Sequence, residues 1–489
     1  MGRREAFAYG LIVAALVCFP AVTCFARGAV NDPDVWWHLK AGEWIFGHRA
    51  WPVADAFSSW GSGRPWAAYS WLPELMLFGL HQALGLRGLA LFTAAVSVAI
   101  VAALFAMLRR LNPNTTLAVG LTLVGGLGLL SLESPRPWLL SILCFVIELD
   151  LLLTAGRTGN RRLLLWLVPL FALWANMHIQ FVFGLAVLGA AVAEVVLARV
   201  LPEHWFHEDS RRIGPGWMTG IFALSAAATL LNPYHYHLYQ VALELLGQSK
   251  LWNVIQELRA MAFRSVSDWT VLAVTVAAAF ALGWRRRPRL LLLILLVVGA
   301  WFAFRSRRDG WIVLVVGLAV LADAAPGLGA ARLAVPRWIR GAVAAAVTLA
   351  LAAGTLLVSE SRLQEKVAAK FPVEAARFLH DHGCGGRLFN PFHWGGYLIY
   401  YLPEVPVSMD GRTMVHGQER VLRHARTLRG SPKWREDQEL AKADVVLVPA
   451  ESVLAELLRL DSRYLLVYED PVAIVFRAGR VKIAKNVPK

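Results

Sequence analysis

Long apolar segments separated by short polar loops make up most of the first 360 residues. Runs of about 16–22 apolar residues recur from residue 6 to residue 358, and a helix of this length crosses the hydrocarbon layer of a membrane. We therefore predict a polytopic α-helical membrane domain over residues 1–360. About eleven spans are predicted, at 6–26, 88–108, 115–132, 137–155, 163–178, 181–199, 217–232, 269–283, 289–304, 310–322 and 341–358.

The pattern changes after residue 360. Short apolar runs bounded by turn residues predict strands, and the amphipathic stretches between them predict helices. Together they predict a small α/β domain over residues 361–489, with a three- or four-stranded sheet closed by a terminal hairpin. The predicted strands are 387–390, 405–410, 443–450, 464–470 and 472–478, and the predicted helices include 372–382 and 451–460.

The composition supports a membrane protein. Apolar residues make up 57% and charged residues 17% of the 489 positions, which excludes an ordinary soluble enzyme. The net charge of +15 is spread over short loops, so it is typical of an orientation signal rather than of a nucleic-acid-binding surface. The first segment lacks a convincing cleavage site, and we predict an uncleaved anchor. Four scattered cysteines predict neither a disulfide framework nor a metal site: Cys18, Cys24, Cys144 and Cys384.

Arginine placement predicts the topology. With the N-terminus inside, the second, fourth, sixth, eighth and tenth spans each end in a basic inner loop, which agrees with the positive-inside rule. This parity requires that residues 71–86 do not cross, and Glu74, His81 and a short apolar length favour a surface-lying or re-entrant helix there. The loop 27–87 and the C-terminal domain then face outward. The basic positions are Arg3, Arg4, Arg109, Arg110, Arg157, Arg161, Arg162, Arg199, Arg211, Arg212, Arg285, Arg286, Arg287, Arg332, Arg337 and Arg340.

The first outer loop, 27–87, is acidic and rich in tryptophan. Asp32 and Asp34 flank Pro33 just beyond the first span, and a short interfacial helix is predicted from Asp34 to Phe46. One interpretation is a helix start, with Asp32 as N-cap and Pro33 at the first helical position. The other is a general base at the membrane surface, because a carboxylate at this boundary is costly unless it is used. The loop also carries Trp36, Trp37, Trp44, Trp51, Trp60, Trp66 and Trp71, a residue type enriched at this interface.

Cationic side chains recur at the predicted outer ends of other spans. They are Arg136 at the start of one span, His178 at the end of another, and Arg305, Arg307 and Arg308 in one exit loop. Contact with lipid headgroups is one explanation. A cluster of arginines on the outer side is better explained by a phosphate ligand, which guanidinium groups bind in bidentate fashion. His235, in the NPYHYH loop, is interpreted as a hydrogen-bonding or interfacial residue rather than as a metal ligand.

Several short motifs together resemble the GT-C superfamily of membrane glycosyltransferases. The string DPDVWWHLKAGEWI opens the first outer loop and is followed by WP-x-x-DAFS, RPW and WLPE. SPRPWLL, LWANMH, LLNPYHY, FRSRRDG, NPFHWGGYL and SMDGR follow along the chain, so the resemblance covers nearly all of it. The superfamily includes protein O-mannosyltransferases and the aminoarabinose transferases of lipid A, and the chain is similar to a bacterial branch.

The resemblance implies inverting transfer of a hexosyl or pentosyl group at the outer face of a bacterial inner membrane. The donor is expected to be a polyprenyl-phosphate-linked sugar and the acceptor a hydroxyl or an amine. The usual base is the first of an acidic pair, which maps to Asp32, whereas the capping interpretation leaves Asp34 available, so both stay candidates. Here Pro33 separates the two, while the common pair is adjacent. Substrate contacts are expected from Trp37, His38, Glu74, Arg136, His178, His235, Arg305 and Arg308.

No cofactor is predicted. Some superfamily members use a divalent metal, and a lone acidic motif without a second clear carboxylate in the SPRP loop favours the metal-free kind. The sequence names neither the sugar nor the acceptor.

Two other functions stay open. A lipid or polysaccharide transporter or flippase predicts inverted repeats and ionisable residues near mid-bilayer, for which Glu148, Asp150 and Glu194 are partial candidates. A non-catalytic membrane assembly protein of the same fold is the third reading, against which the intact acidic pair argues.

Overall fold

The computed structural model describes residues 3–28, 30–285, 288–325, 336–383 and 385–479. The chain divides into two compact units. The helical unit comprises Met1–Ala29, Tyr69–Leu246 and Ile255–Glu360, and the mixed unit comprises Val30–Ala68, Gly247–Val254 and Ser361–Lys489. Most of the first outer loop therefore packs with the C-terminal region. The predictions made for Cys384, Arg286, Arg287 and Arg332 fall outside the described residues.

All the spans predicted from the sequence fall largely on helix in the helical unit. Its helices are α1 (Arg3–Arg27), α3 (Trp71–Leu84), α4 (Leu86–Leu111), α5 (Thr115–Leu129), α6 (Trp138–Thr158), α7 (Leu167–Met177), α8 (Phe181–Val200), α9 (Pro215–Ala228), α10 (His237–Gly247), α11 (Val266–Gly283), α12 (Leu290–Arg305), α13 (Gly310–Ala324) and α14 (Arg337–Leu357). Short 3-10 turns include Leu130–Leu132, Arg161–Trp166, Gln256–Leu258 and Arg307–Asp309.

Among the described residues, seven helices are long and apolar enough to cross a membrane. They are Phe7–Arg27, Leu86–Leu111, Thr115–Leu132, Trp138–Thr158, Phe181–Val200, Val266–Gly283 and Arg337–Leu357. The protein is therefore a multi-pass membrane protein. Helix α3 has 14 residues, and the predicted spans on α7, α9, α12 and α13 are likewise shorter than the roughly 20 residues that a span needs. That residues 71–86 do not cross therefore stays a prediction.

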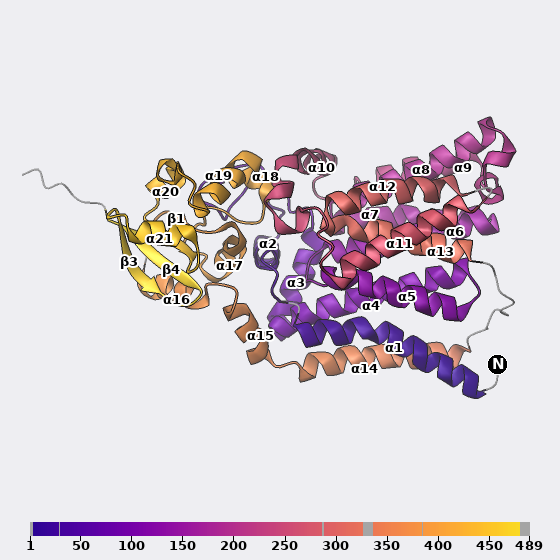
Figure 1. Cartoon of the computed structure of the whole chain (residues 1–489), viewed down its shortest axis with the longest axis horizontal. Coiled ribbons are helices and arrows are strands. Elements are labelled where there is room, and N and C mark those ends of the chain that lie inside the picture. Colours follow the sequence, from indigo (N-terminus) through magenta and orange to yellow (C-terminus); the bar gives the residue numbers. More distant parts are fainter. Residues whose placement is uncertain (1–2, 29, 286–287, 326–335, 384, 480–489) are drawn as a thin grey trace, which may run out of the picture. The chain divides into compact units, whose positions relative to one another are not determined.

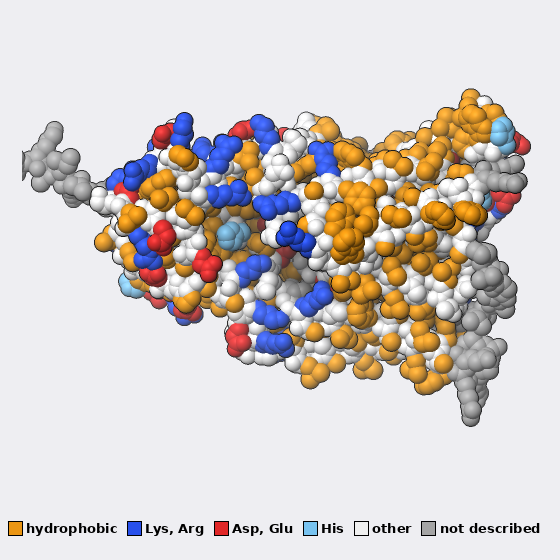
Figure 2. All heavy atoms as spheres, in the orientation of Figure 1, with side chains coloured by type: hydrophobic (Ala, Val, Ile, Leu, Met, Phe, Trp, Pro, Cys, Tyr) orange, Lys and Arg blue, Asp and Glu red, His pale blue; other side chains and the backbone are white. Residues whose placement is uncertain are grey.

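Packing in the helical unit follows the hydrophobic pattern of each helix. Helix α13 is apolar on all sides and buries most of its residues, whereas α14 buries only Ile339 and Thr355. Helix α14 lies beside α1 (Figure 1). Apolar side chains cover much of the surface of this unit (Figure 2). Phe280 and Leu349, for example, are 70% and 69% exposed. Such a surface fits contact with lipid.

Arginines of the predicted inner loops also hold the helical unit together. Asp323 near the end of α13 lies 2.5 Å from both Arg157 and Arg285. Arg289, which is 4% exposed, lies 3.0 Å from Asp209. Arg157 and Arg285 thus have a structural role in addition to the orientation role predicted from the sequence.

The mixed unit contains the predicted α/β domain. Its helices are α2 (Val35–His48), α15 (Glu360–Ala368), α16 (Val373–Asp381), α17 (Phe392–Tyr401), α18 (Thr413–His416), α19 (Gln418–Leu428), α20 (Gln438–Lys442) and α21 (Val453–Arg459). Its strands are β1 (Leu388–Phe389), β2 (Val445–Pro449), β3 (Tyr464–Glu469) and β4 (Ala473–Ala478). The sheet order is β1-β2-β4-β3, with β1 parallel to β2 and the other pairs antiparallel, so β3 and β4 form the predicted hairpin.

The strand predicted at 405–410 is wrong. Val407 makes only an isolated bridge with Ser58 of the outer loop, and residues 407–410 are all buried instead of alternating. The Asn390 side chain makes the hydrogen bonds that a neighbouring strand would make. It accepts from the Ser408 N–H and donates to the Met409 carbonyl oxygen. The segment is therefore a buried turn that is fixed by side chains.

Candidate functional site

The acidic motif lies immediately before α2. The predicted helix start at Asp32 and Pro33 is wrong, because Asp34 is the N-cap residue and the helix begins at Val35. Asp32 instead accepts a hydrogen bond from the Asp34 N–H at Oδ1, 2.9 Å away, which closes a tight turn. The Asp32 residue is only 9% exposed. The motif is therefore a preformed turn with one oriented carboxylate.

Glycines of two C-terminal motifs permit close approach to this turn. A methyl group on Gly411, in SMDGR, would overlap Asp34 Oδ1 and lie 3.2 Å from Trp37 Nε1. A methyl group on Gly396, in WGGY, would lie 2.6 Å from the Pro33 carbonyl oxygen. These contacts bring the acidic motif and two distant C-terminal motifs together in one place.

Helix α2 is buried on more than one side. The Trp36 ring packs edge-on against Phe371 at 5.7 Å and Tyr397 at 5.4 Å, measured between ring centroids. The Trp37 ring lies 3.6 Å from the His38 ring, and both residues are buried. This packing explains why aromatic residues occupy more than one face of the helix. It fixes the direction in which the acidic turn enters the unit.

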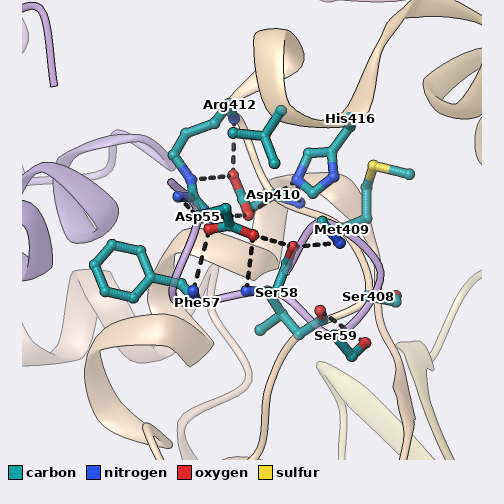
Figure 3. A network of polar contacts seen from close by, with 12 residues as sticks. Asp55, Phe57, Ser58, Ser59, Ser408, Met409, Asp410, Arg412 and His416 are labelled. Atoms are coloured by element: carbon teal, nitrogen blue, oxygen red, sulfur yellow. Dashed lines mark hydrogen bonds and ion pairs between the residues drawn. The ribbon is translucent and has the colours of Figure 1, made fainter. Parts of the chain in front are cut away.

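A buried ionic network links Asp55 of the outer loop to Asp410 and Arg412 of the C-terminal region (Figure 3). The Arg412 guanidinium lies 2.7 Å from Asp55 and 2.8 Å from Asp410, and all three side chains are 1% exposed or less. It also lies over the rings of Phe57 at 5.0 Å and Trp66 at 4.7 Å. Burial by itself would raise the pKa of Asp410, but the Arg412 charge outweighs it and holds that pKa well below its ordinary range.

His416 extends the network toward α19. Arg420 donates to His416 Nδ1 at 2.6 Å, and a guanidinium can only donate. His416 Nε2 lies 3.0 Å from Asp410 Oδ2 and 3.2 Å from the backbone nitrogen of Asp410. Arg420 also pairs with Glu439 at 2.6 Å and donates to the Ser408 carbonyl oxygen. Ion pairs and hydrogen bonds therefore connect Asp55 of the outer loop, through Arg412 and Asp410, to His416 and α19.

The predicted outer cations of the helical unit are organised around carboxylates. Arg136, 9% exposed, lies 2.9 Å from Glu257, and Arg308 lies 3.9 Å from the same carboxylate. Arg307 pairs with Asp268 at 3.0 Å. These cations are therefore partly neutralised within the protein.

The remaining substrate-contact candidates of the helical unit differ in burial and in hydrogen-bond partners. His178 Nδ1 shares a hydrogen bond with Ser141 Oγ at 3.0 Å, and Arg305 lies over the Trp301 ring at 4.7 Å. His235 is exposed, with its Nδ1 3.1 Å from the Leu230 carbonyl oxygen. Glu74 is 1% exposed in the first turn of α3.

Sequence reasoning missed the residues that organise these clusters. In the sequence, Asp55 stands out only as part of WP-x-x-DAFS and Arg412 only as part of SMDGR, and nothing singles out His416 or Glu257. The Asp-Gly-Arg spacing gave a signal for a local turn, but it could not identify Asp55 as the partner. No group of three or more histidine, cysteine or acidic residues suited to a metal ion occurs in the described part of the chain.

Comparison with known proteins identifies the fold. No family model matches the sequence, and no curated protein matches it. The structure is similar to the Archaeoglobus fulgidus oligosaccharyltransferase in its apo form, with 11% identity, a TM-score of 0.55, and coverage of 90% of this chain and 69% of that one. The same enzyme tethered to an acceptor peptide with the NVT sequon gives a TM-score of 0.56. ArnT from Cupriavidus metallidurans, bound to undecaprenyl phosphate, gives 0.48 at 14% identity, covering 97% of this chain and 98% of that one.

The oligosaccharyltransferase is a GT-C membrane glycosyltransferase, and its likeness extends over most of the present chain. It agrees with the resemblance drawn from the short sequence motifs. The chain therefore has the fold of the GT-C membrane glycosyltransferases.

Proposed function

We propose that the protein transfers a sugar, with inversion, from a polyprenyl-phosphate donor to an acceptor hydroxyl or amine at the outer membrane face. The observation that carries the proposal is the preformed acidic turn, in which the Asp34 N–H orients the Asp32 carboxylate. A general base must be held in position, and such a base contributes about 10²–10⁴-fold to the rate. The GT-C fold supports a glycosyltransferase as the class of enzyme.

We assign the two aspartates different roles. Asp34 Oδ1 occupies the space beside Gly411 that any larger residue would need, so Asp34 acts as a positioning residue that seats α2 on the SMDGR turn. Asp32 is then the base, which takes the acceptor proton as the acceptor attacks the anomeric carbon. The bond from that carbon to the lipid phosphate breaks, and the phosphate leaves as an anion.

Arginines of the helical unit are proposed to bind that phosphate. Arg136 and Arg308 are both partly buried and share Glu257, so a phosphate that replaced Glu257 could take two guanidinium partners. Arg305 and His178 are further candidates. Trp37, His38, Glu74 and His235 remain proposed substrate contacts. The fold carries no evidence on the identity of the sugar, so we propose only a hexosyl or pentosyl group.

The proposal is tested with the purified full chain in lipid, radiolabelled polyprenyl-phosphate sugars and candidate acceptors. Asp32→Asn should lower turnover about 10²–10⁴-fold while the melting temperature stays near that of the wild type. Asp34→Asn should lower turnover and melting temperature together. Asp381→Asn, at an exposed position of the mixed unit, is the matched control. Wild-type turnover by Asp32→Asn would remove the proposed base.

The phosphate assignment is tested separately. Arg136→Met and Arg308→Met should each weaken binding of a polyprenyl phosphate at least several-fold, because each removes a charged hydrogen-bond donor. Arg162→Met, at an exposed position of a predicted inner loop, should leave binding unchanged. If all three variants bind the lipid phosphate as the wild type does, the arginine assignment is wrong even where transfer activity persists.

A further inference from the structure

A cavity in the helical unit contains a buried carboxyl group that the proposed reaction does not use. Four helices, α1, α4, α5 and α6, line it, mainly with apolar side chains such as Phe19, Ile100 and Leu129. Ser97 and Glu133 are its polar residues. The space open to water-sized groups is about 20 Å³, which is room for one small group.

One oxygen of Glu133 has no hydrogen-bond partner. The side chain of Glu133 is 8% exposed, and its Oε1 accepts a hydrogen bond from Thr23 Oγ1 at 3.0 Å. Its Oε2 is buried and has no hydrogen-bond partner among the described residues. A buried acceptor that is left unsatisfied costs about 1–3 kcal/mol, so the cavity is suited to a ligand that donates a hydrogen bond there.

A guanidinium group lies at the same place. Arg27 Nη1 is 3.8 Å from Glu133 Oε2 and donates to the Leu130 carbonyl oxygen at 3.0 Å, while its side chain is 55% exposed. Glu133 follows directly after the apolar segment Thr115–Leu132, and Arg27 ends Phe7–Arg27. The pair is thus at the boundary of two candidate spans, where phospholipid headgroups lie.

We propose that this cavity and Arg27 bind a phospholipid with a primary amine in its headgroup. The ammonium would enter the cavity and donate to Glu133 Oε2, the phosphate would pair with Arg27, and the acyl chains would stay in the surrounding lipid. A primary ammonium has about the size of a water molecule and suits the available space, whereas the trimethylammonium of choline is too large. A headgroup without an amine would bring no cation to the carboxylate. This site is independent of the proposed sugar transfer.

The charge state of Glu133 gives the site a pH dependence. Burial raises the pKa of Glu133 to about 7, and Thr23, Arg27 and Cys24, all on α1, partly oppose this. Ser97 on α4 contacts Cys24, and the lining residues of α5 and α6 are apolar. An ammonium pairs only with the ionised carboxyl group. Amine-lipid affinity should therefore rise about fivefold to tenfold between pH 6 and pH 8.

Lipid selectivity tests the proposal. The purified full chain in detergent is titrated with ethanolamine-, choline- and glycerol-headed phospholipids that have identical acyl chains, and bound lipid is counted by native mass spectrometry. We expect the wild type to prefer the ethanolamine lipid over the choline lipid at least tenfold. Glu133→Gln should bring this ratio close to one. Glu208→Gln, at an exposed ion pair with Arg212, should preserve it.

The selectivity ratio is taken within each variant, so a change in stability does not imitate the expected result. If Glu133→Gln fails to fold, the pH dependence of the wild type decides instead. Equal binding of ethanolamine and choline lipids by the wild type would overturn the proposal, as would a ratio that survives in Glu133→Gln or is the same at pH 6 and pH 8.

Discussion

Replacing Arg412 by methionine should destabilise the mixed unit strongly. The substitution keeps much of the side-chain volume but leaves the Asp55 and Asp410 carboxylates, each fully buried, without their guanidinium partner. Removing one partner of a buried ion pair costs about 3–5 kcal/mol. In a unit of about 150–250 residues, each kcal/mol shifts the melting temperature by about 2–4 °C, so a shift of roughly 6–20 °C is expected.

Two assays measure this effect. Thermal melting of the purified full chain gives its size, and hydrogen–deuterium exchange gives its location. The Phe57 and Ser58 N–H groups donate to the Asp55 carboxylate, so their amides should lose protection when Arg412 is removed. Arg377→Met is the matched control, since Arg377 forms an exposed pair with Glu374 and should cost under about 1 kcal/mol.

A double substitution separates charge from volume. Asp55→Asn combined with Arg412→Met removes one of the uncompensated charges, so the double variant should be more stable than the sum of the two single effects predicts, by about 1–3 kcal/mol. The reasoning would be refuted if Arg412→Met melted within 2 °C of the Arg377→Met control, with ~2 °C taken as the shift expected for 1 kcal/mol. Strict additivity in the double variant would refute it as well.

Three further predictions concern other parts of the chain. Gly395→Ala should lower the melting temperature, because its methyl group would overlap the Met409 carbonyl oxygen, while Gly247→Ala, with open space around it, should not. Burial lowers the pKa of His424 to about 4. Below about pH 6.5 this imidazole is therefore protonated in the unfolded chain but stays neutral in the folded chain. Stability measured by melting should therefore fall between pH 6.5 and pH 4 by up to about 1.4 kcal/mol per unit, and less in His424→Gln. Glu148 is fully buried, and neither of its carboxyl oxygens has a hydrogen-bond partner. The substitution Glu148→Met should therefore raise the melting temperature and leave transferase activity intact. Loss of function with a stable fold would favour the transporter alternative.

Local pattern was sufficient to predict most helices and strands. The apolar segments of α4, α6 and α8 are long enough that burial in lipid or in the bundle makes helix the only backbone form that satisfies its own hydrogen bonds. The β3–β4 hairpin was predicted for a similar reason, since two short apolar runs follow each other across a tight turn.

Errors arose where partners come from distant segments. The stretch 405–410 has the composition of a strand, but Asn390 and Ser59 make the hydrogen bonds that a neighbouring strand would have made. The N-cap was displaced from Asp32 to Asp34 because close packing of Pro33 and Asp34 against Gly396 and Gly411 sets the direction of the chain.

The sequence by itself determined that this is a multi-pass helical protein with a small α/β region and an acidic motif beside its first span. Those features depend on runs and periods of neighbouring residues. Only the tertiary structure decided that residues 30–68 pack with the C-terminal region and that Arg412 joins Asp55 to Asp410. Pairing between buried charges depends on which segments meet in space, and a local pattern carries no information about that.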